Sequence, residues 1–370
     1  MQVILSKENN YQDLKNYILS KNINTILLVC GKSISKLKIN DFFNDLIEDN
    51  INIYRFDDIQ PNPLYESIEK GIKVYKDNHC QAIIAVGGGS IMDIAKCIKL
   101  FMNMDENICY LDQQIIENDI PFIGIPTTAG TGSEATKYAI IYYNHEKVTV
   151  THESSIPEAV LFDDSVLNSL PIYQKKATML DALCHAIESI WAVKANEESQ
   201  KYAYDAIKLV FDNFEGYLNN EDLANKNMLK AANIAGKAIN ITSTTAGHAL
   251  CYKLTSLYGL AHGHSVGLVI SGLFPYILDH LDDYNDLRGK NYLINSLNKI
   301  AKAMNKDNYI QACENYLDLY NKLALPYPQA EESDLDILLS SVNMSRLSNN
   351  PVKLDEKDIK NIYTNILFKI

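Results

Sequence analysis

The sequence predicts an α/β domain built on a parallel sheet, followed by an all-helical domain. Over roughly the first 165 residues, short apolar runs alternate with amphipathic segments, which is typical of a parallel sheet covered by helices. After Pro171 helical spacing dominates and convincing strands are absent. A length of 370 residues also favours two domains, which we place at 1–168 and 169–370.

The elements follow from apolar runs and helical periodicity. Strands are expected at 25–30, 51–56, 81–86, 121–126 and 160–162. Helices between them are expected at 33–48, 64–78 and 91–101. In the second half, helices are expected at 175–193, 198–213, 222–238, 246–257, 291–304 and 309–323.

Composition excludes several classes of protein. Apolar residues make up 47% and charged residues 22%, as in ordinary globular proteins. A net charge of −12 makes binding to nucleic acid or to an anionic membrane unfavourable. The longest apolar run, 265–278, is too short to span a bilayer, and no signal peptide opens the chain, so a cytoplasmic protein is expected. The seven scattered cysteines are expected to be free thiols.

A glycine run follows the third expected strand and indicates a phosphate-binding loop. It consists of Gly87, Gly88, Gly89 and Ser90, and a helix begins directly after it. Glycines let the backbone approach a phosphate, and the helix N-terminus supplies N–H donors with a partial positive charge. The alternative is a plain tight turn in which Ser90 caps the helix.

A second loop, 126–134, follows the fourth expected strand and is rich in hydroxyls and glycines. Thr127, Thr128 and Thr131 can donate hydrogen bonds to a pyrophosphate or ribose, and Lys147 can add a positive charge. The alternatives are a polar surface loop and a solvated lysine.

The first expected strand ends at Gly31, Lys32 and Ser33, without the acidic residue that usually holds the adenosine ribose. This favours NADP(H), while NAD(H) remains open. In the alternative interpretation Ser33 only caps the next helix.

Four residues in the second half indicate a metal site. Asp181 and His185 lie four apart on an expected helix and therefore share a face. If His248 and His262 join them, one oxygen and three nitrogens suit Fe²⁺ or Zn²⁺. Taken singly, these residues are better explained as a surface helix contact, a core histidine and a helix cap; the prediction of a metal site rests on their combination.

Four motifs in order resemble the iron-containing, or group III, alcohol dehydrogenases: 87–96, 126–134, 181–188 and 248–263. The resemblance covers about residues 25–275 and implies a dehydroquinate synthase-like architecture, with the active site in the cleft between the domains. It implies a metal on Asp181, His185, His248 and His262. It places the nucleotide on 87–90, 127, 128, 131, Asn62 and Lys147, with Asp93 of the first motif a further candidate. Dimers or higher homo-oligomers are common in this family.

The sequence departs from the family where many members carry a histidine near the substrate. Tyr252 stands at that position, so a proton relay is expected to run through Tyr252 or His264, or from water. The stretch 241–264 resembles the branch that reduces phosphonoacetaldehyde to hydroxyethylphosphonate. Lys253 and the hydroxyls of 243–245 are candidates for binding a phosphonate; alternatively, Lys253 is solvated and the hydroxyls cap a helix.

The expected function is therefore hydride transfer between NAD(P)H and a small aldehyde or primary alcohol. Three alternatives remain: a general short-chain alcohol or butanol dehydrogenase, a metal- and NAD-dependent lyase or cyclase of the dehydroquinate synthase type, and a non-catalytic nucleotide sensor.

Overall fold

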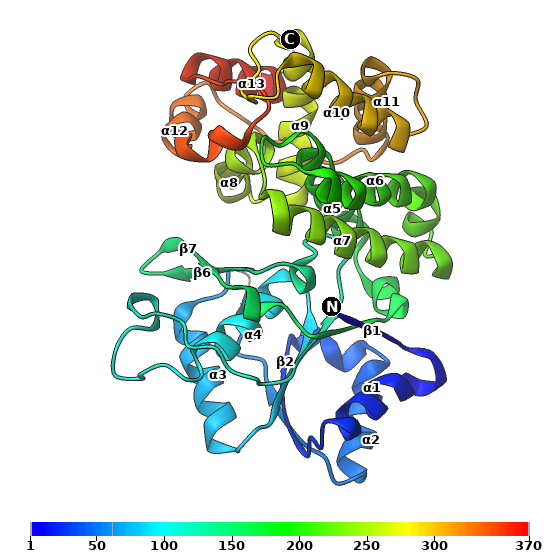
Figure 1. Cartoon of the computed structure of the whole chain (residues 1–370), viewed down its shortest axis with the longest axis vertical. Coiled ribbons are helices and arrows are strands. Elements are labelled where there is room, and N and C mark those ends of the chain that lie inside the picture. Colours follow the sequence, from blue (N-terminus) through cyan, green and yellow to red (C-terminus); the bar gives the residue numbers. More distant parts are fainter. Residues whose placement is uncertain (1, 61, 369–370) are drawn as a thin grey trace. The chain divides into compact units, whose positions relative to one another are not determined.

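A computed structural model of the chain describes residues 2–60 and 62–368. The chain forms two compact units, one ending at Ser169 and the other beginning at Leu170. The first unit combines a parallel sheet with helices, and the second is helical (Figure 1). The fold class predicted from the sequence is therefore confirmed.

The first unit contains a six-stranded parallel sheet in the order β1-β8-β5-β4-β2-β3. The five expected strands are present, as β2(Thr25–Cys30), β3(Asn52–Phe56), β4(Ala82–Gly87), β5(Phe122–Pro126) and β8(Ala159–Phe162). In the register, Cys30 pairs with Val86, and Gly87 pairs with Pro126. The segments that follow β2, β4 and β5 therefore leave the sheet at the same edge.

Three strands of this unit were not predicted: β1(Val3–Ser6), β6(Tyr138–Tyr143) and β7(Glu146–Thr151). β1 is a four-residue edge strand whose Val3 and Ile4 are 44% and 51% exposed, so it lacks a buried apolar run. β6 and β7 form a separate antiparallel hairpin. A bridge between Leu64 and Tyr142 attaches that hairpin to the residue that precedes α3(Tyr65–Asp77).

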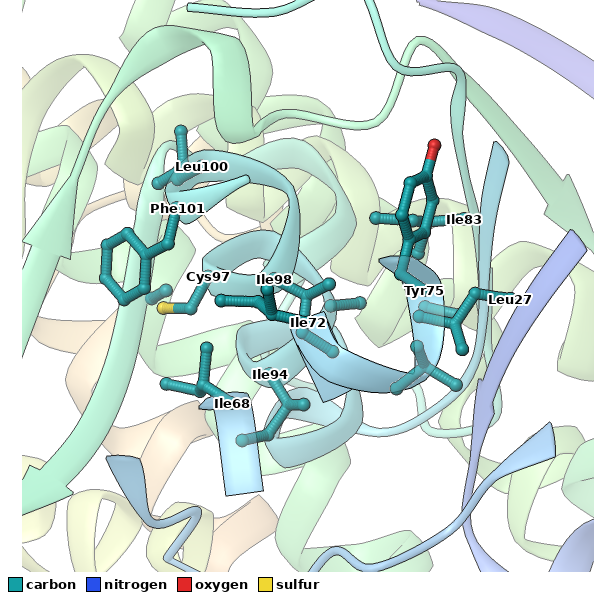
Figure 2. Close-up of a cluster of buried hydrophobic side chains, with 14 of the residues drawn as sticks. Leu27, Ile68, Ile72, Tyr75, Ile83, Ile94, Cys97, Ile98, Leu100 and Phe101 are labelled. Atoms are coloured by element: carbon teal, nitrogen blue, oxygen red, sulfur yellow. The ribbon is translucent and has the colours of Figure 1, made fainter. Parts of the chain in front are cut away.

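Helices cover both faces of the sheet because alternate residues of each strand point to opposite sides. α1(Glu8–Ser20) and α2(Ile39–Glu48) pack on the face that carries Ile26, Leu28 and Ile84. α3(Tyr65–Asp77) and α4(Gly89–Phe101) pack on the face that carries Leu27 and Ile83, as Figure 2 shows. Each fully buried Leu or Ile in these layers contributes about 1.5–3 kcal/mol.

In the second unit, the described residues from Leu170 to Phe368 form helices and no strand. The six expected helices are present, as α5(Ile172–Trp191), α6(Glu197–Leu218), α7(Asp222–Thr242), α8(Ala246–Tyr258), α10(Lys290–Ala303) and α11(Tyr309–Lys322). The sequence did not predict α9(His262–Asp279), α12(Asp334–Ser340) and α13(Glu356–Phe368). α9 contains Pro275 and several glycines, which obscure its helical character in the sequence. Across the described residues, we find no helix with the length and apolar character that crossing a bilayer requires.

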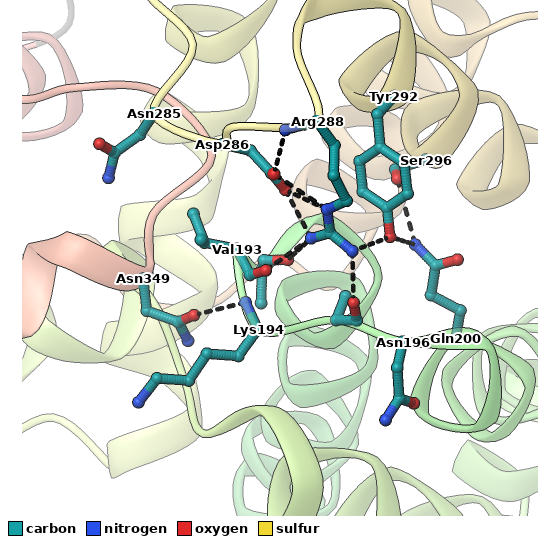
Figure 3. Close-up of polar contacts among 12 residues, drawn as sticks. Val193, Lys194, Asn196, Gln200, Asn285, Asp286, Arg288, Tyr292, Ser296 and Asn349 are labelled. Carbon is teal, nitrogen blue, oxygen red and sulfur yellow. Dashed lines mark hydrogen bonds and ion pairs between the residues drawn. The ribbon is translucent and has the colours of Figure 1, made fainter.

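A polar cluster around Arg288 holds the connection between α5 and α6 (Figure 3). The Arg288 guanidinium pairs with Asp286 and donates hydrogen bonds to the carbonyls of Val193 and Ala195, at 2.5 and 2.6 Å. Its guanidinium carbon also lies 3.7 Å from the centre of the Tyr292 ring. These contacts fix the chain directly after α5, the helix that carries Asp181 and His185.

Candidate metal centre and nucleotide-binding loops

Three helices of the second unit bring the four predicted metal ligands together. Asp181 and His185 project from one face of α5, His248 lies in the first turn of α8, and His262 begins α9. The Nε2 atoms of His248, His262 and His185 lie 3.5, 3.8 and 3.9 Å from the same oxygen, Oδ1 of Asp181. The rings of His185 and His248 stack with their centres 4.4 Å apart.

The donor atoms of this cluster fit a divalent ion. Ligands about 2.0–2.2 Å from a common ion lie roughly 3–4 Å from one another, which matches the three distances to Asp181 Oδ1. The donor atoms of Asp181, His248 and His262 all lie within 4.8 Å of one another, and His185 is outside this mutually close set. Asp181 Oδ1 and His248 Nε2 are buried and have no hydrogen-bond partner within the described chain, although such buried polar atoms are normally satisfied. One carboxylate oxygen and three imidazole nitrogens are ligands that Fe²⁺ and Zn²⁺ accept.

The charges around the cluster favour a cation. Burial acts to raise the pKa of Asp181, but His185, His248 and His262 outweigh it and hold that pKa well below its usual value. Burial also opposes a charged His248, yet Glu188 and Asp181 raise the pKa of His248 to about 9. A bound divalent ion would take the place of the proton that this anionic surrounding attracts.

Glu188 is a candidate site residue that the sequence analysis did not identify. It lies on α5 two turns after Asp181, is fully buried, and contacts His248 Nδ1. This contact leaves Nε2 of His248 facing Asp181. Thr245 donates to Glu188 through its hydroxyl at 2.5 Å and its backbone N–H at 3.0 Å, and Trp191 donates to the Thr245 hydroxyl. A carboxylate behind a ligating histidine is the usual way to fix its ring.

Two glycines permit the close helix packing on which the cluster depends. A Cβ at Gly263 would lie 2.0 Å from the Ala177 carbonyl oxygen and 2.7 Å from the Asp181 Cβ. A Cβ at Gly247 would lie 2.5 Å from Ile270 and 2.9 Å from Glu188. α8 and α9 therefore reach α5 only because these positions lack side chains.

The candidate relay residues lie in different surroundings. The Tyr252 ring stacks on His262 with centres 5.9 Å apart, so this residue adjoins the cluster. His264 is buried against Tyr173, whose hydroxyl lies 3.1 Å from His264 Nδ1, and burial lowers the pKa of His264 to about 4. Lys253 is half-buried and follows Tyr252 on α8.

In the first unit, the two predicted nucleotide-binding loops contact each other. Cβ atoms built on Gly88 and Gly89 would lie 3.3 and 3.0 Å from the side chains of Thr128 and Thr131. Thr127 donates its backbone N–H to the Gly87 carbonyl at 3.1 Å. Both loops lie at the edge where β4 and β5 end, and Ser90 lies in the first turn of α4.

The remaining nucleotide-binding candidates surround these loops. Gly31 follows β2, and a Cβ there would lie 3.9 Å from Ile91, beside the glycine run. Ser33 is exposed in the 3₁₀ turn after β2. Asn62 is exposed, with a left-handed φ of 61°, one residue before Pro63, whose carbonyl accepts from Tyr142. Lys147 pairs with Tyr142 across the β6–β7 hairpin.

Asp93 and Lys96, two buried residues of α4, connect the glycine run at the start of this helix to the loop after β5. Asp93 accepts hydrogen bonds from the Ser133 hydroxyl at 2.9 Å and the Ile140 N–H at 3.1 Å. Lys96 is fully buried and donates to Ser133 and Thr136 and to the carbonyl of Tyr138. Burial lowers the pKa of Lys96 to about 8 despite the opposing effect of Asp93. Both carboxylate oxygens of Asp93 are thus engaged by the protein.

Comparison with known proteins identifies the family. The model of iron-containing alcohol dehydrogenases matches residues 2–164, and the model of the C-terminal domain of the same family matches residues 175–367. The chain therefore belongs to the iron-containing alcohol dehydrogenase family, as the motifs predicted.

Individual relatives extend this result. Alcohol dehydrogenase 4 of Schizosaccharomyces pombe is 31% identical over 244 residues, which cover 64% of this chain and 58% of the yeast protein. Long-chain-alcohol dehydrogenase 1 of Geobacillus thermodenitrificans is 26% identical over 91% of this chain and 88% of its own length. This chain matches only about a third of the aldehyde-alcohol dehydrogenases of Entamoeba histolytica and Streptococcus pneumoniae (35% and 32% of their lengths).

Solved structures share the fold. Sulfoacetaldehyde reductase of Bifidobacterium kashiwanohense, determined in complex with NAD⁺, superposes with a TM-score of 0.87 over 100% of this chain and 98% of that chain, at 22% identity. An iron-containing alcohol dehydrogenase gives a TM-score of 0.84 at 25% identity, over 100% of this chain and 98% of that chain.

Proposed function

We propose that this protein transfers a hydride between NAD(P)H and a small aldehyde or the corresponding primary alcohol, with Fe²⁺ or Zn²⁺ as its metal. One observation carries the proposal: three imidazole nitrogens converge on a single oxygen of Asp181. Membership of the iron-containing alcohol dehydrogenase family supports the same reaction class.

The protein's own residues would do the following work. Asp181 and the three histidines hold the ion, which when bound acts as a Lewis acid on the carbonyl oxygen. Glu188 orients His248 so that Nε2 faces the ion. The His262 side chain is 39% exposed while Asp181 and His248 are buried, so a small substrate reaches the cluster from the side of His262.

Tyr252 is the proposed proton donor for the oxygen of the substrate. Its ring lies against His262, and burial holds the pKa of its hydroxyl well above the usual value. The hydroxyl therefore stays protonated near neutral pH and can donate a hydrogen bond or a proton. His264 faces Tyr173, so we assign the relay to Tyr252.

The nucleotide is proposed to bind along the two contacting loops of the first unit, with its pyrophosphate at the start of α4. The bound nicotinamide supplies or accepts the hydride. Asp93 and Lys96 hold the loops in place through their buried hydrogen bonds to the segment after β5. Gly31, Lys32 and Ser33 after β2 favour NADP(H) because no carboxylate there opposes a 2′-phosphate.

An aldehyde panel assayed with NADPH and NADH tests this proposal. The protein would be stripped of metal and then reloaded with Fe²⁺ or Zn²⁺. We expect activity only after reloading, with one NAD(P)H oxidised for each alcohol formed and with NADPH preferred. Conversion without net oxidation of NAD(P)H would indicate a lyase or cyclase, and activity without metal would overturn the proposed site.

A further inference from the structure

Arg346 adjoins the candidate metal centre through the ring of Tyr252, which contacts both Arg346 and His262. Its guanidinium carbon is 5.4 Å from the centre of the Tyr252 ring, and that ring stacks on His262 at 5.9 Å with an angle of 18° between the planes. A guanidinium, a phenol and an imidazole therefore follow one another. Arg346 is thus within reach of a small molecule that also touches the cluster around Asp181.

Arg346 differs from the other two arginines of the chain in its partners. Arg288 is neutralised by Asp286, and Arg55 donates to the amide oxygens of Asn40 and Asn44. Arg346 is exposed, and no carboxylate of the described residues lies within 4.0 Å of it. In a chain of net charge −12, a cation without a carboxylate partner beside a metal cluster is available for an anion from outside.

The turn that carries Arg346 is anchored to the same helices as the metal cluster. It lies in the 3₁₀ helix η6(Met344–Asn349), which Asn343 caps through the N–H of Ser345 at 3.0 Å. At its other end Asn349 is buried and donates to the carbonyls of Thr242 and Thr244, just before α8. Asn349 also accepts from the N–H of Lys194 after α5, as Figure 3 shows. The backbone of Arg346 is therefore fixed relative to α5 and α8.

We propose that Arg346 binds a terminal phosphonate or sulfonate of the substrate, and that the substrate is a short aldehyde carrying this anion. The inference rests on the proposed function of the metal site. Arg346 lies over the Tyr252 ring and also hydrogen-bonds Tyr252, and the remaining N–H groups of its guanidinium suit the oxygens of a tetrahedral anion. The hydroxyl of Tyr252 then lies between the anion and the carbonyl.

Kinetics of Arg346→Gln test the inference on the holoenzyme. We expect kcat/KM for phosphonoacetaldehyde or sulfoacetaldehyde to fall at least tenfold, mainly through KM, while the value for propanal falls less than threefold. Arg346→Lys should recover part of the loss, since it restores the charge without the planar fork. Arg55→Gln, at an exposed arginine of the first unit, is the matched control. It should leave kcat/KM unchanged for both the charged and the neutral aldehyde. Equal losses for charged and neutral aldehydes would overturn the inference.

Direct binding separates this inference from the proposed reaction. Ethylphosphonate and ethanesulfonate carry the anions but no carbonyl, so calorimetric titration measures their affinity without turnover. We expect both to bind the wild-type protein, the tighter one identifying the preferred anion, and Arg346→Gln to weaken binding at least tenfold. Binding that is absent in the wild-type protein, or unchanged by the substitution, would refute the role of Arg346. Binding through Arg346 in a protein that reduces no aldehyde would refute the proposed reaction alone.

Discussion

A buried carboxylate behind a histidine shows how single residues set the properties of the candidate metal centre. Glu188 contacts Nδ1 of His248 and accepts two hydrogen bonds from Thr245, while Asp181 faces Nε2 on the other side of the ring. His248 is therefore held between two carboxylates with only one of its nitrogens directed at the ligand cluster. Glu188 would therefore act on a bound metal through His248.

Glu188→Gln tests this positioning role. We expect it to reduce metal affinity about 10–100-fold, because the ring loses the acceptor that fixes its tautomer. Competition between the protein and a chromogenic chelator measures the affinity directly. Glu314→Gln, at an exposed glutamate of α11, is the control and should leave the affinity unchanged. An unchanged affinity in Glu188→Gln would show that Glu188 only supports packing.

Lys175 is a second residue whose burial has a measurable consequence. It is 1% exposed, and its ammonium donates to the Tyr217 carbonyl at 2.8 Å and to the amide oxygens of Asn220 and Asn225. These acceptors are neutral, and burial lowers the pKa of Lys175 to about 8 from its usual 10.5. Folding therefore opposes the charged form of this lysine.

The pH dependence of stability follows from this shift. Between pH 8 and about 10.5 the unfolded chain binds more protons at Lys175 than the folded chain, so the stabilising free energy rises with pH. The contribution is at most about 1.4 kcal/mol per pH unit. Lys175→Met should flatten the slope between pH 8 and 10 in urea unfolding followed by Trp191 fluorescence. Lys201→Met, on the exposed side of α6, should retain the wild-type slope; an identical slope in Lys175→Met would contradict the assignment.

At the scale of elements, two buried charged side chains of α4, Asp93 and Lys96, couple the two loops that we assign to the nucleotide. Lys96 on α4 donates to four acceptors on three residues, Ser133, Thr136 and Tyr138, and Asp93 binds the same segment. The loop after β5 and the β6–β7 hairpin are thus tied to the first turns of α4. The position of the threonines relative to the glycine run depends on this internal connection.

Removing the lysine should be costly. Lys96→Met removes the nearby charge that favours the ionised form of Asp93 and the donor that binds Ser133, Thr136 and Tyr138, and we expect a loss of about 3–5 kcal/mol in the free energy of unfolding. The double variant Asp93→Asn, Lys96→Met should lose less than Lys96→Met alone, because no unpaired charge remains. Urea unfolding followed by circular dichroism measures both. If the double variant is as unstable as the single one, hydrogen bonding rather than charge is the main contribution of Lys96.

For the whole molecule, metal binding and the stability of the helical unit should be linked. The ligands come from α5, α8 and α9, so an ion that binds only the folded state stabilises all three helices together. At a free metal concentration one hundred times the Kd, the expected gain is about 2.7 kcal/mol. Trp191, the single tryptophan, is buried on α5 and reports unfolding of this unit by fluorescence.

Removing the metal with a chelator should therefore lower the unfolding midpoint that Trp191 fluorescence reports. Adding Fe²⁺ or Zn²⁺ should restore it. Asp181→Asn should abolish the response to metal, while Asp336→Asn, at an exposed aspartate of α12, should keep it. If the unfolding midpoint of the wild-type protein does not change with metal, the result would contradict the proposed metal centre.

Part of this molecule could be read from the sequence because its signals are local. Buried strands such as β4 are continuous apolar runs, and Asp181 and His185 share a helix face through their spacing alone. The family motifs extended the prediction to His248 and His262, whose meeting with Asp181 depends on packing through Gly247 and Gly263. The oligomeric state and the preference for NADP(H) stay predictions.

The rest depends on contacts that the sequence does not display. Glu188 and His248 are 60 residues apart, and Arg346 reaches Tyr252 across 94 positions of the chain, so no spacing rule connects either pair. β1 is too short and too exposed to stand out, and its partner β8 begins only at Ala159. Long-range partners of this kind become visible only once the helices and strands are packed.

The pairing of β1 with β8 also constrains how this protein is made. Val3 to Ser6 align with Ala159 to Phe162, so the first strand synthesised has no neighbour until the last strand of its sheet has left the ribosome. Until then the edge of β5 to which β8 docks also stays open, and exposed strand edges invite pairing between nascent chains. Co-translational folding of the first unit can therefore finish only late, which makes this edge the place where a chaperone would be most useful.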